Sequence, residues 1–446
     1  MNRREVLKGL GALGGVLLLN ENLLAKEQTQ KLILIKNAQV FDGVNLLKGA
    51  KDVLIENNII KNVADKIDET TLKDTTIIDA KGKFLMPGLT DAHWHVMFAA
   101  SELDSVNLPD PGLFYANAIN GARDTVMRGF TTVRDMAGAV FGIKTAIDSG
   151  IIYGPRIYPS GAFISQTSGH GDFTPVTANT DGCCECSGIL ERMGEFKVAD
   201  GVPEVLRAVR QQLKKGASQI KIGVGGGVIS AFDPLDSIQF RVDEIKAAVD
   251  AASDWGTYVC AHVYDDNGIN RALDGGVKSI EHGQLVSEKT VARMAKDKAW
   301  LSLQPFEYNE FSPAPKSPKG AILNKAWRNA VKYAKKHNCR FAFGTDCLFN
   351  PAQAKGQNFM LCLFASEIGE LETLRLATSN NCELFKMSKN RDPYGEHELG
   401  RVKNDAYADL ILIDGDPLKD IFVLSKYEDT FKVIIKDGVI VKNTLA

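Results

Sequence analysis

The sequence lacks the features that would indicate a nucleic-acid-binding or repeat protein. Its 446 residues carry a formal net charge of −2, so there is no basic excess for nucleic acid. It has no block of like charge, no short internal repeat and no G-x-x-x-x-G-K-[ST] phosphate loop. With 44% apolar and 24% charged residues, the composition predicts a soluble globular protein with one large domain and a smaller one.

Residues 1–25 predict a targeting segment. Arg3 and Arg4 precede a weakly apolar run over residues 9–19, which is too short to span a bilayer. Paired arginines in this position resemble a twin-arginine export signal, and cleavage is expected after Ala25. We therefore expect a periplasmic or exported protein that meets the twin-arginine export machinery transiently. An uncleaved amino-terminal anchor is the alternative.

The eight cysteines are compatible with disulfides after export. Only Cys183, Cys184 and Cys186 cluster. Three cysteines do not complete a zinc site, so a local structural role is expected for them. The others are scattered among apolar runs and are expected to be packed thiols.

Both ends of the chain predict small β units. Alternating strand patterns occur in residues 31–41, 51–63, 409–414 and 431–442. Asn57-Asn58 and Asp437-Gly438 are typical hairpin turns within two of these segments. We expect residues 30–84 and 398–446 to form one small β-sandwich domain that flanks the central region.

The central region, residues 85–397, predicts an α/β fold. Short apolar strands alternate with helical patterns, which is typical of a parallel sheet built from βα units. The strand candidates are residues 84–89, 131–135, 156–164, 219–224, 258–262, 279–282, 300–305 and 340–346. Eight such units predict a (β/α)8 TIM barrel with its active site at the carboxyl ends of the strands. The connection 165–200 lacks clear periodicity and is expected to form a wall or lid over the barrel mouth.

Residue types that bind metals recur at the ends of these strands. His93 and His95 stand two residues apart, so their imidazoles point the same way. Later strands contribute Lys221, buried in an apolar run, and then His262, His282 and Asp346. Taken singly, each has a structural explanation, such as a hydrogen-bonded core imidazole or, for Asp346, a helix N-cap. Together, at the same end of successive strands, they predict a metal site.

The order H-x-H, Lys, His, His, Asp resembles the amidohydrolase superfamily of metal-dependent hydrolases over nearly the whole mature chain. The details are similar to its dipeptidase/prolidase branch, which includes Xaa-Pro and Xaa-Arg dipeptidases and ochratoxinase-like amidases. The motifs that carry the resemblance are Pro87-Gly-Leu-Thr-Asp-Ala-His-Trp-His95, Ala199-Asp-Gly-Val, Gln219-Ile-Lys-Ile, Ala261-His-Val-Tyr264, Ser279-Ile-Glu-His-Gly283 and Gly344-Thr-Asp346.

The resemblance implies two divalent metal ions, expected to be Zn²⁺. His93, His95 and Asp346 would hold one, His262 and His282 the second, and a carboxylated Lys221 would bridge them. Burial favours the neutral amine that takes up CO2, and bound metal generates hydroxide near neutral pH. Asp346 would pass the proton to the leaving amine.

Two further residues match positions that contact the substrate carbonyl in this branch. His170 and Tyr264 would therefore bind the substrate and stabilise the developing oxyanion. For Tyr264, packing at a helix start is the structural alternative. Asp233 and Asp236 follow the fourth strand and leave a basic substrate open.

The function expected from these residues is a binuclear amidohydrolase that cleaves a dipeptide or N-acyl amino acid by attack of metal-bound hydroxide. One alternative is a cyclic-amide or imidazolone hydrolase at the same centre. The other is a catalytically inactive binding protein on the same fold. The expected partner is a small-molecule substrate and no nucleic acid, and a homo-oligomer stays open.

Overall fold

The computed structural model describes residues 31–103, 110–175, 188–230, 232–307 and 318–445. The predicted signal segment, residues 1–25, and the cluster of Cys183, Cys184 and Cys186 lie outside the described residues. Within the described parts of the chain, no helix has the length and apolar character needed to cross a membrane.

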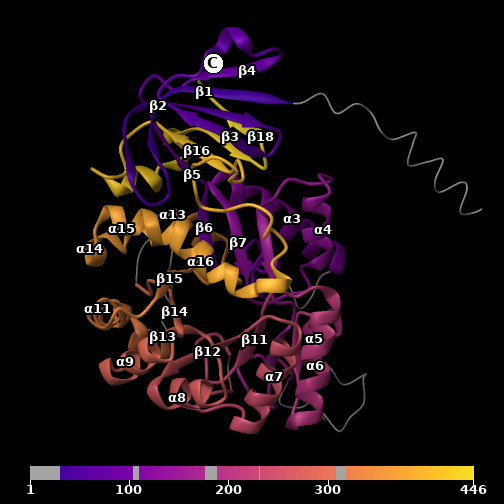
Figure 1. Cartoon of the computed structure of the whole chain (residues 1–446). Helices are drawn as coiled ribbons and strands as arrows, with labels where there is room; N and C mark the ends of the chain where they lie inside the picture. The colour runs from indigo at the N-terminus through magenta and orange to yellow at the C-terminus, as the bar shows by residue number, and fades with distance from the viewer. Residues whose placement is uncertain (1–30, 104–109, 176–187, 231, 308–317, 446) are drawn as a thin grey trace, which may run out of the picture.

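The two ends of the chain meet in one sheet, as the strand patterns predict. Figure 1 shows the indigo amino-terminal strands and the yellow carboxyl-terminal strands together at one end of the molecule. The contact is made where β16 pairs antiparallel with β5, which also pairs parallel with β1. The eight strands, in the spatial order β18-β17-β16-β5-β1-β2-β3 with β4 on β1, are β1 (Leu32–Phe41), β2 (Leu46–Glu56), β3 (Ile59–Ala64), β4 (Thr75–Asp79), β5 (Phe84–Pro87), β16 (Leu410–Ile413), β17 (Phe431–Lys436) and β18 (Val439–Asn443).

This end sheet has its own apolar core, to which both termini contribute. Ile35 and Val53 from the amino-terminal strands pack in one cluster with Leu412 and Val433 from the carboxyl-terminal strands. Asn57 and Asp437 have positive φ angles of 56° and 53°, which suits the two tight turns that their sequence predicts. A two-layer sandwich built from this sheet stays a prediction.

The central region is built from two parallel sheets. Three strands form one sheet in the order β6-β7-β8, and seven form the other in the order β10-β9-β11-β12-β13-β14-β15. They are β6 (Leu89–Trp94), β7 (Phe130–Asp135), β8 (Arg156–Pro159), β9 (Phe163–Ser165), β10 (Phe196–Val198), β11 (Ile220–Gly223), β12 (Val259–Asp265), β13 (Ser279–Leu285), β14 (Trp300–Leu303) and β15 (Phe341–Phe343).

Backbone hydrogen bonds join both edges of the three-stranded sheet to the seven-stranded sheet. On one side, the Ser218 amide donates to the Pro159 carbonyl at 2.7 Å, which joins the start of β11 to the end of β8. On the other side, the Asp346 amide donates to the His93 carbonyl at 2.8 Å, which joins the chain after β15 to β6. These contacts are consistent with the predicted (β/α)8 barrel.

Helices connect the strands and cover the sheets. For example, α6 buries one apolar stripe made of Val205, Val209 and Leu213. The helices are α3 (Pro111–Met127), α4 (Phe141–Asp148), α5 (Ile189–Met193), α6 (Gly201–Lys215), α7 (Val242–Asp254), α8 (Asp266–Asp274), α9 (Glu288–Lys296), α10 (Pro318–Leu323), α11 (Trp327–His337), α12 (Pro351–Lys355), α13 (Gln357–Cys362), α14 (Ala365–Ile368), α15 (Glu370–Arg375), α16 (Asn381–Phe385) and α17 (Tyr427–Thr430), with the short turns η1 (Glu69–Thr71), η2 (Leu376–Asn380), η3 (Lys386–Arg391) and η4 (Ile421–Leu424).

Two expected strands differ from the structure, and the connection 165–200 contains an element that its sequence does not indicate. The apolar run at residues 84–89 is divided between β5 of the end sheet and β6 of the parallel sheet. The strand expected over residues 156–164 breaks into β8 and β9, because Gly161 turns the chain with φ at 72°. The connection 165–200 contains a short strand, β10, which pairs with β9, and Phe196 on that strand lines the central cavity.

Candidate metal centre

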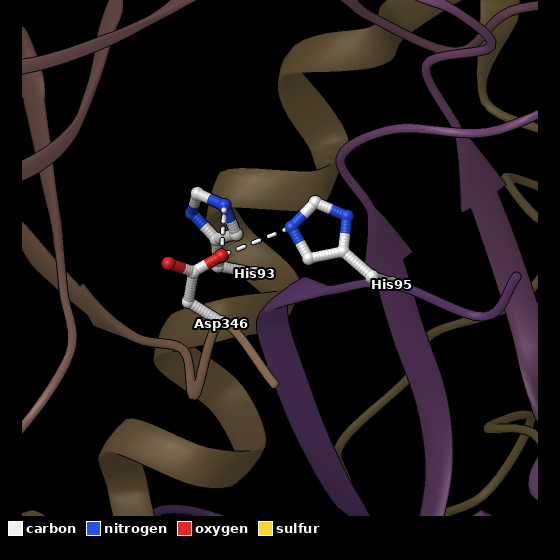
Figure 2. A group of neighbouring side chains, drawn as sticks. All are labelled: His93, His95 and Asp346. Atoms are coloured by element: carbon white, nitrogen blue, oxygen red, sulfur yellow. Dashed lines mark hydrogen bonds and ion pairs between the residues drawn. The ribbon is translucent and has the colours of Figure 1, made fainter. Parts of the chain in front are cut away.

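His93, His95 and Asp346 converge where β6 and β15 end (Figure 2). Their nitrogen and oxygen ligand atoms all lie within 4.8 Å of one another. The Oδ1 atom of Asp346 is 2.9 Å from His95 Nε2 and 3.3 Å from His93 Nε2. Two imidazole nitrogens and a carboxylate oxygen at such separations form a set that can hold a divalent cation.

The backbone brings this group together. The Asp346 amide donates to the His93 carbonyl, and a Cβ placed on Gly344 would lie 2.4 Å from the Cβ of His93. Only glycine therefore permits this approach of the chain after β15 to β6. Asp346 and His282 have positive φ angles of 54° and 80°, and backbone strain of this kind in non-glycine residues is typical of functional sites.

Lys221 lies beside the same group. Its Nζ is 3.3 Å from His93 Nε2, and its side chain is buried. Burial lowers the pKa of the Lys221 amine, and this effect outweighs the nearby charges of Glu281 and Asp346, which raise it. A lysine in this setting is closer to the neutral amine that can react with CO2.

His262 and His282 complete the cluster from β12 and β13. Their ring centroids are 4.3 Å apart, and the His282 ring is 4.8 Å from that of His93. Burial lowers the pKa of both residues well below the usual range for histidine, and it lowers the pKa of His95 to about 4. These three imidazoles are therefore neutral at pH 7 and have lone pairs available for a metal.

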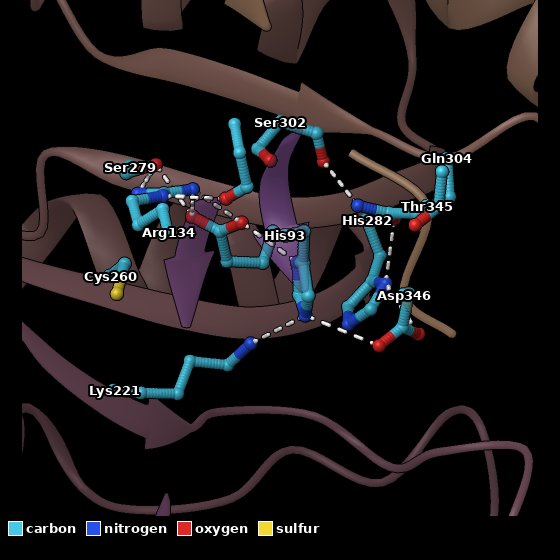
Figure 3. A network of polar contacts seen from close by, with 12 residues as sticks. His93, Arg134, Lys221, Cys260, Ser279, His282, Ser302, Gln304, Thr345 and Asp346 are labelled. Carbon is cyan, nitrogen blue, oxygen red and sulfur yellow. Dashed lines mark hydrogen bonds and ion pairs between the residues drawn. The ribbon is translucent and has the colours of Figure 1, made fainter. Parts of the chain in front are cut away.

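A hydrogen-bond network behind His93 fixes which nitrogen faces the cluster (Figure 3). Burial alone would raise the pKa of Glu281, but the charge of Arg134 lowers it well below the usual range. The carboxylate accepts two hydrogen bonds from Arg134 Nη2, at 2.7 and 2.8 Å. An ionised carboxylate can only accept, so His93 Nδ1–H donates to it at 2.9 Å. A neutral His93 then has its lone pair on Nε2, toward Lys221 and Asp346.

The polar atoms of the cluster fit a cation. His93 Nε2 and Asp346 Oδ1 are two lone-pair atoms 3.3 Å apart, and such a pair repels unless a proton or cation lies between them. Burial alone would raise the pKa of Asp346, but the positive charge of a protonated His93 and hydrogen bonds from His93 and His95 would lower it well below its usual range. The buried Nδ1 of His95 has no partner among the described residues. A divalent cation on Nε2 and Oδ1 would remove the repulsion.

His170 stands over His262 and is held by the loop that follows β11. The two rings stack with centroids 4.1 Å apart, and His170 Nδ1 is 2.6 Å from Ser230 Oγ. A Cβ on Gly227 would lie 1.9 Å from the His170 ring, so glycine is needed there. Asp233 is 2% exposed, accepts from the Gly227 amide at 2.7 Å and lies 3.5 Å from His170 Nδ1.

Asp233 therefore does not meet a basic substrate, because its carboxylate is directed at His170 and Gly227. Tyr264 lines the cavity next to the cluster, with its ring 4.9 Å from that of His282. Burial raises the pKa of the Tyr264 phenol well above its usual value. The phenol consequently keeps its proton and can donate a hydrogen bond.

The six proposed ligands, His170 and Tyr264 all line one cavity of about 340 Å³. This size suits a small molecule. Residues 84–441 match the sequence model of the amidohydrolase family. The chain belongs to this family.

Individual amidohydrolases resemble the chain over most of its length. Ochratoxinase from Aspergillus niger is 32% identical over 367 residues, which cover 77% of this chain and 72% of that protein. The crystal structure of a prolidase complexed with N-methylphosphonate-L-proline superposes with a TM-score of 0.83 at 32% identity, covering 93% of this chain and 100% of the other. An Xaa-Pro dipeptidase with bound methionine gives 0.77 at 28% identity, with coverage of 93% and 100%.

These relatives confirm the branch that the motifs indicate, and the protein is a hydrolase that acts on amide bonds. The family is metal-dependent, and His93, His95 and Asp346 provide a site for a metal. Sequence reasoning missed Arg134, Glu281 and the role of Asp233. A charged residue inside a buried strand, as in Phe130-Thr-Thr-Val-Arg-Asp135, was the signal that could have revealed Arg134.

Proposed function

We propose that the protein is a binuclear amidohydrolase that cleaves the amide bond of a dipeptide or N-acyl amino acid. The observation that carries this proposal is the convergence of four imidazoles, Lys221 and Asp346 on one cavity. His93, His95 and Asp346 would hold one divalent ion, and His262 and His282 the other. The named activities of the ochratoxinase and prolidase relatives support the class of substrate.

Lys221 would bridge the two ions as a carbamate. The neutral amine adds to CO2 and releases one proton, which leaves an anion with two oxygens for two cations. The lowered pKa of this buried amine supports that step. Bound zinc would supply an activated water and polarise the scissile carbonyl.

The remaining groups would orient the substrate and move protons. His170 and Tyr264 line the cavity beside His262 and His282, and their N–H and O–H groups would donate to the substrate carbonyl oxygen. The Asp346 carboxylate would take a proton from water and deliver it to the leaving nitrogen. The pKa of this carboxylate is well below its usual range, so the group is ionised before it takes up the proton.

We also propose how the domains are built and where the protein is located. The two parallel sheets would close as the (β/α)8 barrel, since backbone hydrogen bonds join them on both sides. Residues 30–84 and 398–446 would form the flanking sandwich. The paired Arg3 and Arg4 support export by the twin-arginine route to the periplasm.

The test is a hydrolysis scan of dipeptides, N-acyl amino acids and cyclic amides, with zinc and bicarbonate supplied. Turnover of the linear amides supports the proposal. Turnover of cyclic amides or imidazolones alone would replace it with the alternative reaction at the same centre. Less than about one metal per chain, together with no hydrolysis, would indicate a binding protein.

A further inference from the structure

One part of the cavity is lined by apolar side chains. Leu103, Phe173, Leu348 and Phe349 line the cavity and are partly exposed. They come from three separate segments, which follow β6, β9 and β15. We refer to these four residues as the apolar wall.

The apolar wall is backed by buried rings and begins beside the metal centre. Phe98 is fully buried, and its ring centroid lies 4.9 Å from Phe349 and 6.0 Å from His95. Phe173 packs against Phe196 at 4.7 Å. Rings held by other rings form a preorganised surface, which binds an apolar group without the cost of ordering itself.

None of the four residues of the apolar wall is charged. Among the described residues that line the cavity, Lys221 and Asp346 are the charged side chains apart from the imidazoles, and both belong to the metal centre. Asp233 is the acidic residue nearest in sequence to β11, and its carboxylate accepts from the Gly227 amide and lies beside His170. A charged substrate group placed against the wall would lose its hydration and gain no partner.

We infer that the apolar wall is a subsite for a large uncharged group, above all an aromatic ring, attached on one side of the scissile amide. The substrate class is then N-acyl amino acids or dipeptides with an aromatic or large aliphatic group, and basic and acidic side chains are disfavoured there. The inference rests on the proposed function for its reaction. Its binding component can be measured separately.

Turnover by the zinc-loaded, bicarbonate-treated enzyme tests the inference with two matched series. The acyl series compares N-benzoylglycine with N-acetylglycine, and the amine series compares the N-acetyl derivatives of phenylalanine, leucine, glycine, lysine and aspartate. Burial of a phenyl group predicts a kcat/KM that is about 10–100-fold higher for the aromatic member of at least one series. Equal kcat/KM values throughout both series would overturn the subsite while leaving the hydrolase function intact.

A variant locates the preference. Phe349→Ala is expected to reduce the aromatic preference about tenfold or more while hydrolysis of the small substrates continues. The matched control is Phe422→Ala, on η4 and 39% exposed, which leaves the preference unchanged. An unchanged preference in Phe349→Ala would show that the ring binds elsewhere.

Calorimetric binding covers the case in which no amide is hydrolysed. Two pairs are compared, benzoylglycine with acetylglycine and N-acetylphenylalanine with N-acetylglycine, and in at least one pair the aromatic ligand is expected to bind the full-length enzyme about tenfold or more tightly. If turnover fails but this difference is present, the proposed reaction falls and the subsite stands. If neither pair shows a difference, the subsite falls whatever the enzyme hydrolyses.

A second, independent observation concerns Lys319 on α10. Its Nζ donates to the backbone carbonyls of Gly227, Ser230 and Asp233 at 2.9, 2.9 and 2.6 Å. All three ammonium donors of the lysine are therefore directed at one loop. The same three loop residues lie around the His170 ring. Gly227 leaves room for the ring because it has no Cβ, the Ser230 hydroxyl is hydrogen-bonded to it, and the Asp233 carboxylate lies beside it.

The geometry points to Lys319 as a positioning residue that holds this loop, and through it His170, over the metal centre. Lys319→Met removes the three donors and keeps a similar chain length. Hydrogen exchange of the Gly227 amide, which donates to Asp233, should accelerate about tenfold or more because local opening becomes easier. In the active enzyme, kcat should fall about tenfold with little change in KM.

Lys332→Met, at an exposed lysine on α11, is the matched control and should change neither quantity. Hydrogen exchange at Gly227 does not depend on turnover, so it tests whether Lys319 holds the loop even if no substrate is found. Unchanged exchange in Lys319→Met would overturn the positioning role. Faster exchange with an unchanged kcat would show that the loop is held but that His170 does not depend on it.

Discussion

The Nζ of Lys221 lies 3.3 Å from Nε2 of His93, and both side chains are buried. Glu281 binds the other nitrogen of the imidazole, so the lone pair of a neutral His93 faces the lysine. The amine has a pKa lowered by burial. A cation bound next to these two residues would therefore interact favourably with the His93 lone pair and with the modified Lys221.

Replacing Lys221 tests the bridge. Lys221→Ala should lose at least one of the two bound metals and reduce turnover by several orders of magnitude, because the carbamate proposed on Lys221 is the group that would join the two ions. Metal content and kcat are measured together. Lys214→Ala, at an exposed position on α6, serves as the control. Full activity in Lys221→Ala would overturn the binuclear proposal.

Glu281→Gln tests the support of His93. The amide is neutral, so Arg134 loses its buried counter-ion and His93 loses the carboxylate that fixes its tautomer. Metal affinity should fall about 10–100-fold, as is usual when the hydrogen-bond partner of a metal-binding histidine is changed. Competition with a chromophoric chelator measures it. An affinity equal to that of the parent enzyme would show that Arg134 and Glu281 have a purely structural role.

Gly227→Ala tests the stack of His170 on His262. The new Cβ would lie 1.9 Å from the His170 ring, and the ring can move because it is a partly exposed side chain. We expect kcat to fall about 10–100-fold with only a small loss of stability. Gly142→Ala is the matched control, because its Cβ would meet nothing within 4 Å on α4. That substitution should be neutral or stabilise by about 0.4–1 kcal/mol.

Glu195 gives the pH dependence of stability. Burial raises its pKa from 4.5 to about 7, and its Oε1 atom has no partner among the described residues. The raised pKa favours the folded state below pH 4.5, and this contribution is lost as the pH rises toward 7. Glu195→Gln removes the ionisation. The variant should match the parent near pH 4.5 and exceed its stability by roughly 1–3 kcal/mol at pH 8.

Denaturant unfolding at several pH values between those limits measures this difference. A gain in stability that stays the same at every pH would mean that Glu195 does not ionise within this pH range. The pH dependence could then come from Asp135, whose pKa burial also raises and which is close enough to feel the charge of Glu195.

The convergence of the proposed ligands on one cavity could be predicted because their signals are local. The pair His93 and His95 follows a strand, and parallel strands bring their carboxyl ends to one edge, so His262, His282 and Asp346 were expected to meet them. The hairpin turns at Asn57 and Asp437 have the same local origin. Their sequence sets the turn, and the turn sets the pairing of neighbouring strands.

The supporting contacts could not be predicted, because they join residues that only the tertiary fold makes neighbours. Arg134 and Glu281 are separated by 147 positions, and neither strand sequence indicates its partner. Asp233 follows β11 as an ordinary loop residue would, and only the structure directs it toward His170. The break between β8 and β9 depends on the φ angle of Gly161, which glycine allows but does not require.

The central claim is that this cluster binds two divalent ions, and elemental analysis of the purified full-length enzyme tests it most directly. The protein, expressed with zinc and bicarbonate and freed of loosely bound metal, should contain about two ions per chain. Exhaustive chelation should abolish amide hydrolysis, and zinc with bicarbonate should restore it. Fewer than about one ion per chain, with hydrolysis of linear amides unaffected by the chelator, would contradict the claim.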